Sequence, residues 1–243
     1  MDHTNNSCCC GEAEYFSGCL ICGAPITYRA ESSIQTCSIC HKEQLTNAVC
    51  ENGHFICDAC HSYGTYAPVI TTLRDSTEKD ALLLLEKIMD LPSVHMHGPE
   101  HHAVVPCVLL TAFRNNGEHM DYDAALSEIC KRAKQVPGGT CGYWGVCGAA
   151  AGAGIFMSVM TGSSPLYKDA WPFPQKLVSI ILSRLADVGG PRCCKRTSRI
   201  AIEEAVHFYS QFCSVNIPLS SITCKYCEDN RECIQEDCPY YPE

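Results

Sequence analysis

The sequence predicts a mainly α-helical protein, in which a helical bundle is flanked by an N-terminal zinc-stapled module and a C-terminal cysteine-rich clasp. Three observations lead to this prediction. Apolar residues recur at helical rather than strand spacing through the middle of the chain. Cysteines occur in pairs separated by two residues near both ends, and 243 residues are enough for one core with small satellite modules.

Cysteine spacing divides the chain more clearly than hydropathy does. We expect residues 1–18 to be a flexible tail, 19–63 a module that binds two metal ions, 64–218 the helical bundle with a central Cys/His site, and 219–243 a four-cysteine clasp.

Helical patterns follow one another through the predicted bundle. The stretch STEKDALLLLEKIMDLP has an apolar face, with Thr77 as the expected N-cap. The next, GPEHHAVVPCVLLTAFRNNG, places Pro99 at the first helical position, and Pro106 must kink or split the remainder of that helix. Further helices are expected over 121–135, 146–161, 174–188 and 197–213, which makes five or six in all.

The N-terminal module contains four pairs of metal-ligand residues, in CLICG, CSICH and CENGHFICDACH. A Cys-x2-Cys knuckle bends the backbone so that both thiolates reach one ion, and two pairs complete a tetrahedral zinc site. Eight ligands make two closed zinc sites, whose simplest role is to hold the module folded. The ligands are Cys19, Cys22, Cys37, Cys40, Cys50, His54, Cys57 and Cys60.

The order of these pairs, with Gly53 directly before His54, resembles that of cross-brace RING and treble-clef zinc modules. The resemblance implies that the sets interleave, with Cys19, Cys22, Cys50 and His54 on one zinc ion and Cys37, Cys40, Cys57 and Cys60 on the other. Pairing in sequence order is the alternative. His41 and His61 directly follow their knuckles and are alternative ligands.

The clasp carries four cysteines within CKYCEDNRECIQEDCP, namely Cys224, Cys227, Cys233 and Cys238. Four thiolates in so short a segment, the last followed by proline, suit a 4Fe-4S iron-sulfur cluster or a structural zinc ion equally well. Acidic neighbours disfavour further negative charge on a reduced cluster, which favours a structural or low-potential centre.

A third constellation lies in the predicted bundle. In GGPRCCKR, the adjacent Cys193 and Cys194 are flanked by three cations near a helix start, a setting that lowers a thiol pKa and favours the nucleophilic thiolate. Adjacent cysteines rarely form an unstrained bridge, so the pair is split between two roles or binds one metal through both sulfurs. One buried and one exposed cysteine without chemistry is the plain alternative.

The stretch PGGTCGYWGVCGAAAGAG adds Cys141 and Cys147 to this constellation. We expect these two cysteines and Cys193 and Cys194 to hold a cluster or reactive centre inside the bundle. Glycines after Cys147 leave their helix with little side-chain bulk, so a neighbouring helix or a bound centre can approach its backbone. Two inert cysteines in a small-faced core helix are the alternative.

The loop HMHGPEHH can bring two or three imidazoles together. It carries His95, His97, His101 and His102. With Cys193 and Cys194, His101 and His102 are the candidate catalytic residues, and solvated surface histidines are the alternative.

Composition excludes several function classes. A net charge of -9 and a pI near 5.5 argue against a nucleic-acid binder, because phosphate-backbone binding needs a basic stripe. The uncharged run over 140–167 is interrupted by Gly, Ser, Thr and Pro, so no membrane span is expected. Twenty-one cysteines without a secretory leader indicate metal or redox chemistry in a reducing cytoplasm, in an organism that keeps thiols from oxygen.

From residue 19 to its end the chain resembles a cysteine-rich domain family of unknown function from anaerobic archaea and bacteria, sometimes found beside or fused to methyltransferases. The motifs that carry the resemblance are MHGPEHH, PGGTCGYWGVCGAAAGAG, GGPRCCKR and NRECIQEDCP. Within it, CGAAAGAGIFMSVMTG is locally similar to the putative redox-active Cys-Gly-Cys-Ala family. These likenesses imply redox or metal chemistry.

Three functions are consistent with these patterns. The first is a protein with zinc and iron-sulfur centres in redox or sulfur-handling chemistry, working with a redox or transferase partner. The second is a metal-dependent transferase or accessory enzyme for a methyl or thiol group, which needs an ion with fewer than four protein ligands. The third is a non-catalytic adaptor that docks a partner through the zinc module.

Overall fold

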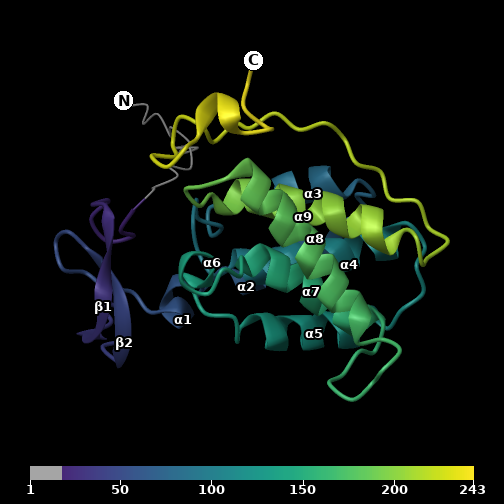
Figure 1. Ribbon diagram of the computed structural model, residues 1–243, viewed down its shortest axis with the longest axis horizontal. Helices are drawn as coiled ribbons and strands as arrows, with labels where there is room; N and C mark the ends of the chain where they lie inside the picture. The colour runs from purple at the N-terminus through teal and green to yellow at the C-terminus, as the bar shows by residue number, and fades with distance from the viewer. Residues whose placement is uncertain (1–17) are drawn as a thin grey trace, which may run out of the picture.

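Among its described residues the protein is mostly helical, with one antiparallel hairpin close to the start of that part (Figure 1). The computed structural model describes residues 18–243, so the flexible tail expected over 1–18 lies almost entirely outside the described residues. In chain order the elements are β1 (Ile26–Thr36), β2 (Glu43–Cys50), α1 (Asp58–His61), α2 (Tyr66–Asp75), α3 (Ala81–Met89), α4 (His101–Asn115), α5 (Tyr122–Ala133), α6 (Thr140–Tyr143), α7 (Gly148–Met160), α8 (Pro172–Val188), α9 (Cys194–Tyr209) and the 3-10 turn η1 (Gln235–Asp237).

The hairpin of β1 and β2 was not predicted from the sequence. Its register runs from Ile26 opposite Cys50 to Thr36 opposite Glu43, with an irregularity between Tyr28 and Ser33. Most of β1 is exposed, because the hairpin lies to one side of the helices and buries neither face fully (Figure 1). Without a buried face there is no alternation of apolar and polar residues to reveal a strand.

The expected helices form, with shifted starts. The side chain of Asp80 accepts hydrogen bonds from the backbone N–H groups of Leu82 and Leu83, so α3 begins at Ala81, and the expectation of Thr77 as N-cap was wrong. The apolar face of α3, with Leu84, Leu85 and Ile88, is fully buried as predicted. Helix α9 begins three residues earlier than expected, with Cys193 as its N-cap.

Helix α4 is the centre of the helical part and packs against α2, α3, α5, α7 and α9. All residues from His101 to Phe113 are buried. Of the two expected outcomes at Pro106, a kink or a split, the split does not occur, because α4 runs without a break from His101 to Asn115. The missing N–H of Pro106 leaves the carbonyl of His102 without the usual helical partner. That carbonyl faces α7 at Gly152, where a Cβ would come within 2.5 Å of its oxygen.

Glycines of α7 allow close helix contacts, as the sequence predicted. At Gly148 a Cβ would overlap the imidazole of His102, and at Gly154 it would lie 2.6 Å from Val178 in α8. The small face of α7 therefore serves helix packing against α4 and α8.

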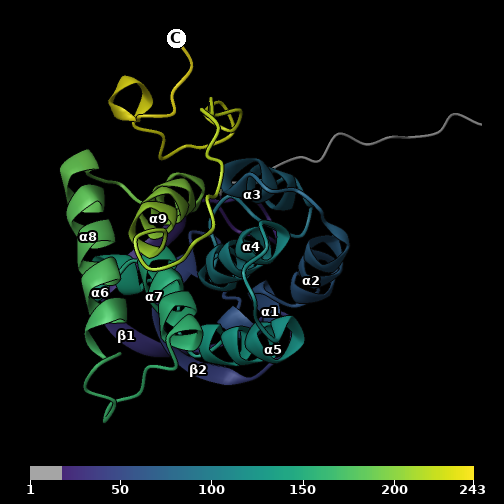
Figure 2. The ribbon, with the colours of Figure 1, turned by 90° about the vertical axis from the view of Figure 1, so that its right-hand side faces the viewer.

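The C-terminal segment after α9 has little regular structure and crosses over the start of that helix (Figures 1 and 2). Tyr226 and Tyr240 of this segment are buried. Across residues 18–243, no helix has both the length and the apolar character that crossing a bilayer requires.

We predict that Gly148→Ala lowers the free energy of unfolding by about 1–3 kcal/mol, because the added methyl group overpacks the contact between α7 and His102. Urea denaturation of the metal-loaded protein measures the change. Gly142→Ala is the control, since a Cβ at Gly142 meets nothing within 4 Å. Equal denaturation midpoints for the two variants would contradict the prediction.

Candidate metal centres

The first group of ligands joins the loop before β1 to the end of β2. The ligand atoms of Cys19, Cys22, Cys50 and His54 all lie within 4.8 Å of one another. The Sγ atoms of Cys22 and Cys50 are 3.9 Å apart, and His54 Nδ1 lies 3.3 Å from Cys22 Sγ. Zinc-sulfur bonds of about 2.3 Å in a tetrahedron place neighbouring sulfurs roughly 3.8 Å apart, so this group can hold one metal ion.

The second group joins the turn between the strands to α1. Its members Cys37, Cys40, Cys57 and Cys60 also lie within 4.8 Å of one another, with Cys40 Sγ 3.8 Å from Cys57 Sγ. Cys57 is the N-cap of α1 and Cys60 lies within that short helix, which ends at His61. The second group too can hold one metal ion. The two groups are the sets that interleaved pairing joins, and ligands of neighbouring pairs in the sequence are not grouped together.

The thiols of these two groups differ widely in pKa. Hydrogen bonds from the backbone of Ala24 and the side chain of Asn52 lower the pKa of Cys22 to about 6. Burial and hydrogen bonds with Cys40 and Cys57 raise the pKa of Cys60 to about 12. Crowded thiolates repel one another, so a cation is needed for all four thiols of the second group to ionise together.

The alternative ligands in this module lie outside both groups. His41 follows Cys40 with a positive φ of 58° in the turn between the strands. His61 is not a member of the second group, and its Nδ1 lies 3.2 Å from Glu100 Oε2 at the start of α4.

The clasp cysteines gather around a small pocket with Cys193. Besides these five cysteines the pocket is lined by the cations Arg196 and Arg199 of α9 and by Met96, Tyr226, Asn230 and Ile234. Unlike the N-terminal ligands, the clasp cysteines form no group of three within 4.8 Å in the described part of the chain. Their sulfurs are therefore spread more widely than the ligands of one tetrahedral ion.

Contacts on both sides of the pocket hold the clasp in place. The Tyr226 hydroxyl donates to Asp90 at 2.7 Å, and the Tyr240 hydroxyl donates to Glu203 of α9 at 2.9 Å. On the other side His97 lies 3.1 Å from Asn230 Oδ1. His97 thus supports the clasp.

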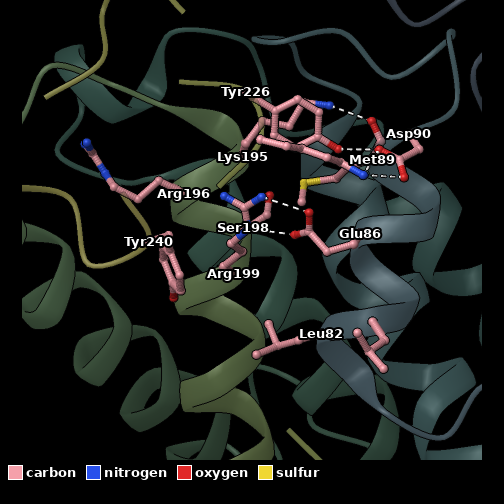
Figure 3. Close-up of polar contacts among 12 residues, drawn as sticks. Leu82, Glu86, Met89, Asp90, Lys195, Arg196, Ser198, Arg199, Tyr226 and Tyr240 are labelled. Atoms are coloured by element: carbon pink, nitrogen blue, oxygen red, sulfur yellow. Dashed lines mark hydrogen bonds and ion pairs between the residues drawn. The ribbon is translucent and has the colours of Figure 1, made fainter. Parts of the chain in front are cut away.

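The cations beside the pocket are buried. Arg199 has no exposed side-chain surface and makes two hydrogen bonds to Glu86 of α3, at 2.6 and 2.9 Å (Figure 3). Arg196 donates to the carbonyls of Gly189 and Pro191. Arg199 Nη1 and Arg196 Nε are buried with no hydrogen-bond partner, although both residues line the pocket. Buried donors without partners favour an anionic occupant.

The adjacent cysteines of α9 diverge. Cys193 faces the clasp pocket, whereas Cys194 faces the backbone N–H of Gly98 and has Cys147 as an electrostatic neighbour. The expectation of lowered pKa values was wrong, because the surrounding protein keeps water from both sulfurs and raises the pKa of Cys194 to about 12. Lys195 does not offset this, since its Nζ donates to the carbonyls of Met89 and Val94.

The four central cysteines do not meet at one centre. Cys193 belongs to the clasp pocket, Cys147 is half-buried at the start of α7 beside Thr197, and Cys141 is exposed in α6. Burial raises the pKa of Cys147. In the described residues no three of these cysteines form a group compact enough for one ion.

His101 and His102 are buried among backbone carbonyls. His101 Nε2 lies 2.9 Å from the carbonyl of His95 and its Nδ1 lies 3.2 Å from the Ser198 hydroxyl. Burial lowers the pKa of His101 to about 3, so the ring is neutral and donates to the carbonyl while accepting from Ser198. His102 Nδ1 lies 3.0 Å from the carbonyl of Val136. Both rings are thus held by backbone carbonyls, those of His95 and Val136.

A third compact group, of His61, His95 and Glu100, was not assembled from the sequence. The two histidines lie in different sequence contexts, one as an alternative zinc ligand and one in the HMHGPEHH loop. No sequence pattern marks Glu100 as a ligand, because nothing in the sequence shows that its carboxylate is buried beside the two histidine rings. Burial opposes its ionisation, but hydrogen bonds with His61 and His95 hold the pKa of Glu100 well below its usual range.

The grouping of the N-terminal ligands can be tested by metal stoichiometry. We predict that Cys19→Ser/Cys50→Ser loses one metal equivalent, because both ligands belong to one group. Cys19→Ser/Cys37→Ser takes one ligand from each group and is expected to lose two. Elemental analysis after dialysis against a weak chelator measures the content. Pairing in sequence order would reverse the two results.

Comparison with known proteins places the chain in a family without assigning an activity. No curated protein and no solved structure is significantly similar to the chain. The model of the Family of unknown function (DUF5714) matches residues 69–241, from α2 to the clasp, which is more than half of the chain. Both N-terminal ligand groups precede the matched region. The chain therefore belongs to the Family of unknown function (DUF5714).

Proposed function

We propose that the protein is a redox protein in which Cys193 and the clasp hold an iron-sulfur cluster, while two zinc ions keep the N-terminal module folded. The observation that carries the proposal is the pocket that five cysteines line together with Arg196 and Arg199. When bound, such a cluster supplies one-electron transfer.

The donor set fits an iron-sulfur cluster better than a single zinc ion. Five cysteines are available for four iron positions, and their sulfurs are spread more widely than those of the two N-terminal groups. Cationic neighbours suit a thiolate-bound cluster because its net charge is negative. The two guanidinium nitrogens without hydrogen-bond partners, Arg196 Nε and Arg199 Nη1, also favour a negatively charged group in the pocket.

Residues around the pocket are arranged to stabilise negative charge on sulfur. The backbone N–H of Gln235 donates to Cys233 Sγ at 3.4 Å, and that of Arg196 donates to Cys193 Sγ at 3.4 Å. Hydrogen bonds to cluster sulfurs and nearby cations favour the reduced form. With a cluster held here, the chemistry supplied would be the transfer of one electron between a reduced and an oxidised partner protein. The half-buried clasp leaves a short path to the surface.

The N-terminal groups suit a structural role, because four protein ligands leave no position for a substrate. The hairpin with interleaved ligands supports a treble-clef or RING-like module over residues 19–63. Residues 64–218 then form a helical bundle beneath the clasp at 219–243. We place the protein in a reducing cytoplasm, as its many thiols require.

We predict that protein purified without oxygen contains iron and acid-labile sulfide in a ratio near one. Cys233→Ser is expected to lose most of both, because it removes a sulfur from the pocket. Cys213→Ser is the control, since Cys213 is a cysteine outside the pocket, and it should retain both.

Iron, sulfide and electron paramagnetic resonance spectra before and after reduction measure the outcome. One zinc ion bound by the clasp, without sulfide, would overturn the cluster and leave a structural clasp.

We further predict that Arg196→Gln makes the reduction potential of the cluster more negative. Removing a buried positive charge beside the pocket disfavours the added electron, by several tens of mV or on the order of 1 kcal/mol. Lys131→Gln, on the exposed face of α5, is the matched control for loss of a cation. A redox titration followed by electron paramagnetic resonance measures the potentials. Equal shifts in both variants would contradict a specific role for Arg196.

A further inference from the structure

We infer that His61, His95 and Glu100 form a third metal centre, which binds a divalent first-row transition metal ion and leaves at least one coordination position open. It is separate from the two N-terminal groups and from the clasp pocket. The inference does not depend on the proposed cluster, because it uses none of the same side chains.

Distances within the group match those between neighbouring ligands on one ion. His95 Nδ1 lies 2.9 Å from Glu100 Oε1, and His61 Nδ1 lies 3.2 Å from Glu100 Oε2. Metal-nitrogen and metal-oxygen bonds of about 2.1 Å place neighbouring ligands roughly 3.0–3.4 Å apart. The two imidazole rings meet edge to face, with centroids 4.8 Å apart. One ion can therefore contact all three residues after small side-chain movements.

Three separate parts of the fold hold the ligands. His61 is the last residue of α1, directly after Cys60 of the second N-terminal group. Glu100 is the N-cap of α4, and its carboxylate lies so close to Gly98 that a Cβ there would overlap it. The backbone N–H of His95 donates to Glu100 Oε1 at 3.0 Å.

His101 is a positioning residue for this centre. Its Nε2 donates to the carbonyl of His95 at 2.9 Å, and Ser198 of α9 holds its other ring nitrogen. Metal ligands are usually held in position by hydrogen bonds from neighbouring residues that do not themselves bind the metal. His101, one of the candidate catalytic residues of the sequence analysis, thus lies beside this centre and supports the loop that carries His95.

The centre is buried on the carboxylate side and open on the imidazole side. The side chain of Glu100 is 0% exposed, whereas those of His61 and His95 are 19% and 25% exposed. Within residues 18–243 no fourth His, Cys, Asp or Glu joins the compact group. Two histidines, one carboxylate and an open position are the ligand set of catalytic zinc sites and of non-haem iron(II) sites. The open position takes water, which the metal makes more acidic.

The competing explanation is a hydrogen-bonded cluster without metal, in which protonated histidines neutralise the buried carboxylate. Metal binding distinguishes the two, because only the metal centre adds one equivalent to the stoichiometry. The chosen variants are His95→Ala and Glu100→Gln. His61 is avoided, since its change would disturb Cys60 next to it.

The test titrates the full-length protein, purified without oxygen and with its thiol sites filled, with Co2+. Absorption spectra and elemental analysis follow the binding. The wild-type protein is expected to bind one more equivalent than His95→Ala or Glu100→Gln, and the variants should bind Co2+ at that site at least about tenfold more weakly. His119→Ala, a change to an exposed histidine outside the group, should behave as wild type.

Circular dichroism and the metal content of the thiol sites establish that the variants retain their fold and clasp centre. If Glu100→Gln fails to fold, His95→Ala still decides, because His95 is partly exposed. Equal Co2+ stoichiometry in wild type and folded His95→Ala would overturn the third centre. Loss of this one Co2+ equivalent in a folded variant whose thiol sites keep their metal would support it, whether the clasp holds iron or zinc.

Discussion

The buried cations at the start of α9 are the interaction on which the rest of the structure depends. Arg199 pairs with Glu86, and Lys195 donates to the carbonyls of Met89 and Val94, so one turn of α9 holds α3 and the loop after it (Figure 3). Such a pair contributes little net stability, yet removing one partner costs about 3–5 kcal/mol because the other charge stays buried. This cost makes the position of α9 well defined.

Both candidate centres of the helical part are placed by that turn of α9. On one side Cys193 faces the clasp, and on the other Ser198 holds His101, which supports the loop of His95. The N-terminal module reaches the same region through His61. Metal ions that fold the module would therefore also position a ligand of the third group. This coupling links the structural and the open centres through short covalent connections.

Much of the fold and part of the sites could be predicted from local sequence patterns. Apolar spacing revealed the buried face of α3. Three Cys-x2-Cys pairs and one Cys-x3-His pair revealed the ligands that form the two N-terminal groups. The hairpin could not be predicted from the sequence, because its strands bury no continuous face and so show no alternation of apolar and polar residues. The lowered pKa expected for Cys194 failed because charge in the sequence does not show where a side chain points, and Lys195 points away from it.

The sequence by itself determined helices α3, α4, α5, α7, α8 and α9, the small face of α7 and the metal-ligand pairs, because each depends on residues within one or two turns of the chain. It did not reveal α1, α2 or α6. Only the tertiary structure decided that Cys193 and Cys194 face different surroundings, and that Glu100 joins two histidines from separate segments. These decisions depend on how α4, α7 and α9 pack. This packing depends on the volumes and buried charges of side chains that lie far apart in the sequence, so local sequence patterns do not reveal it.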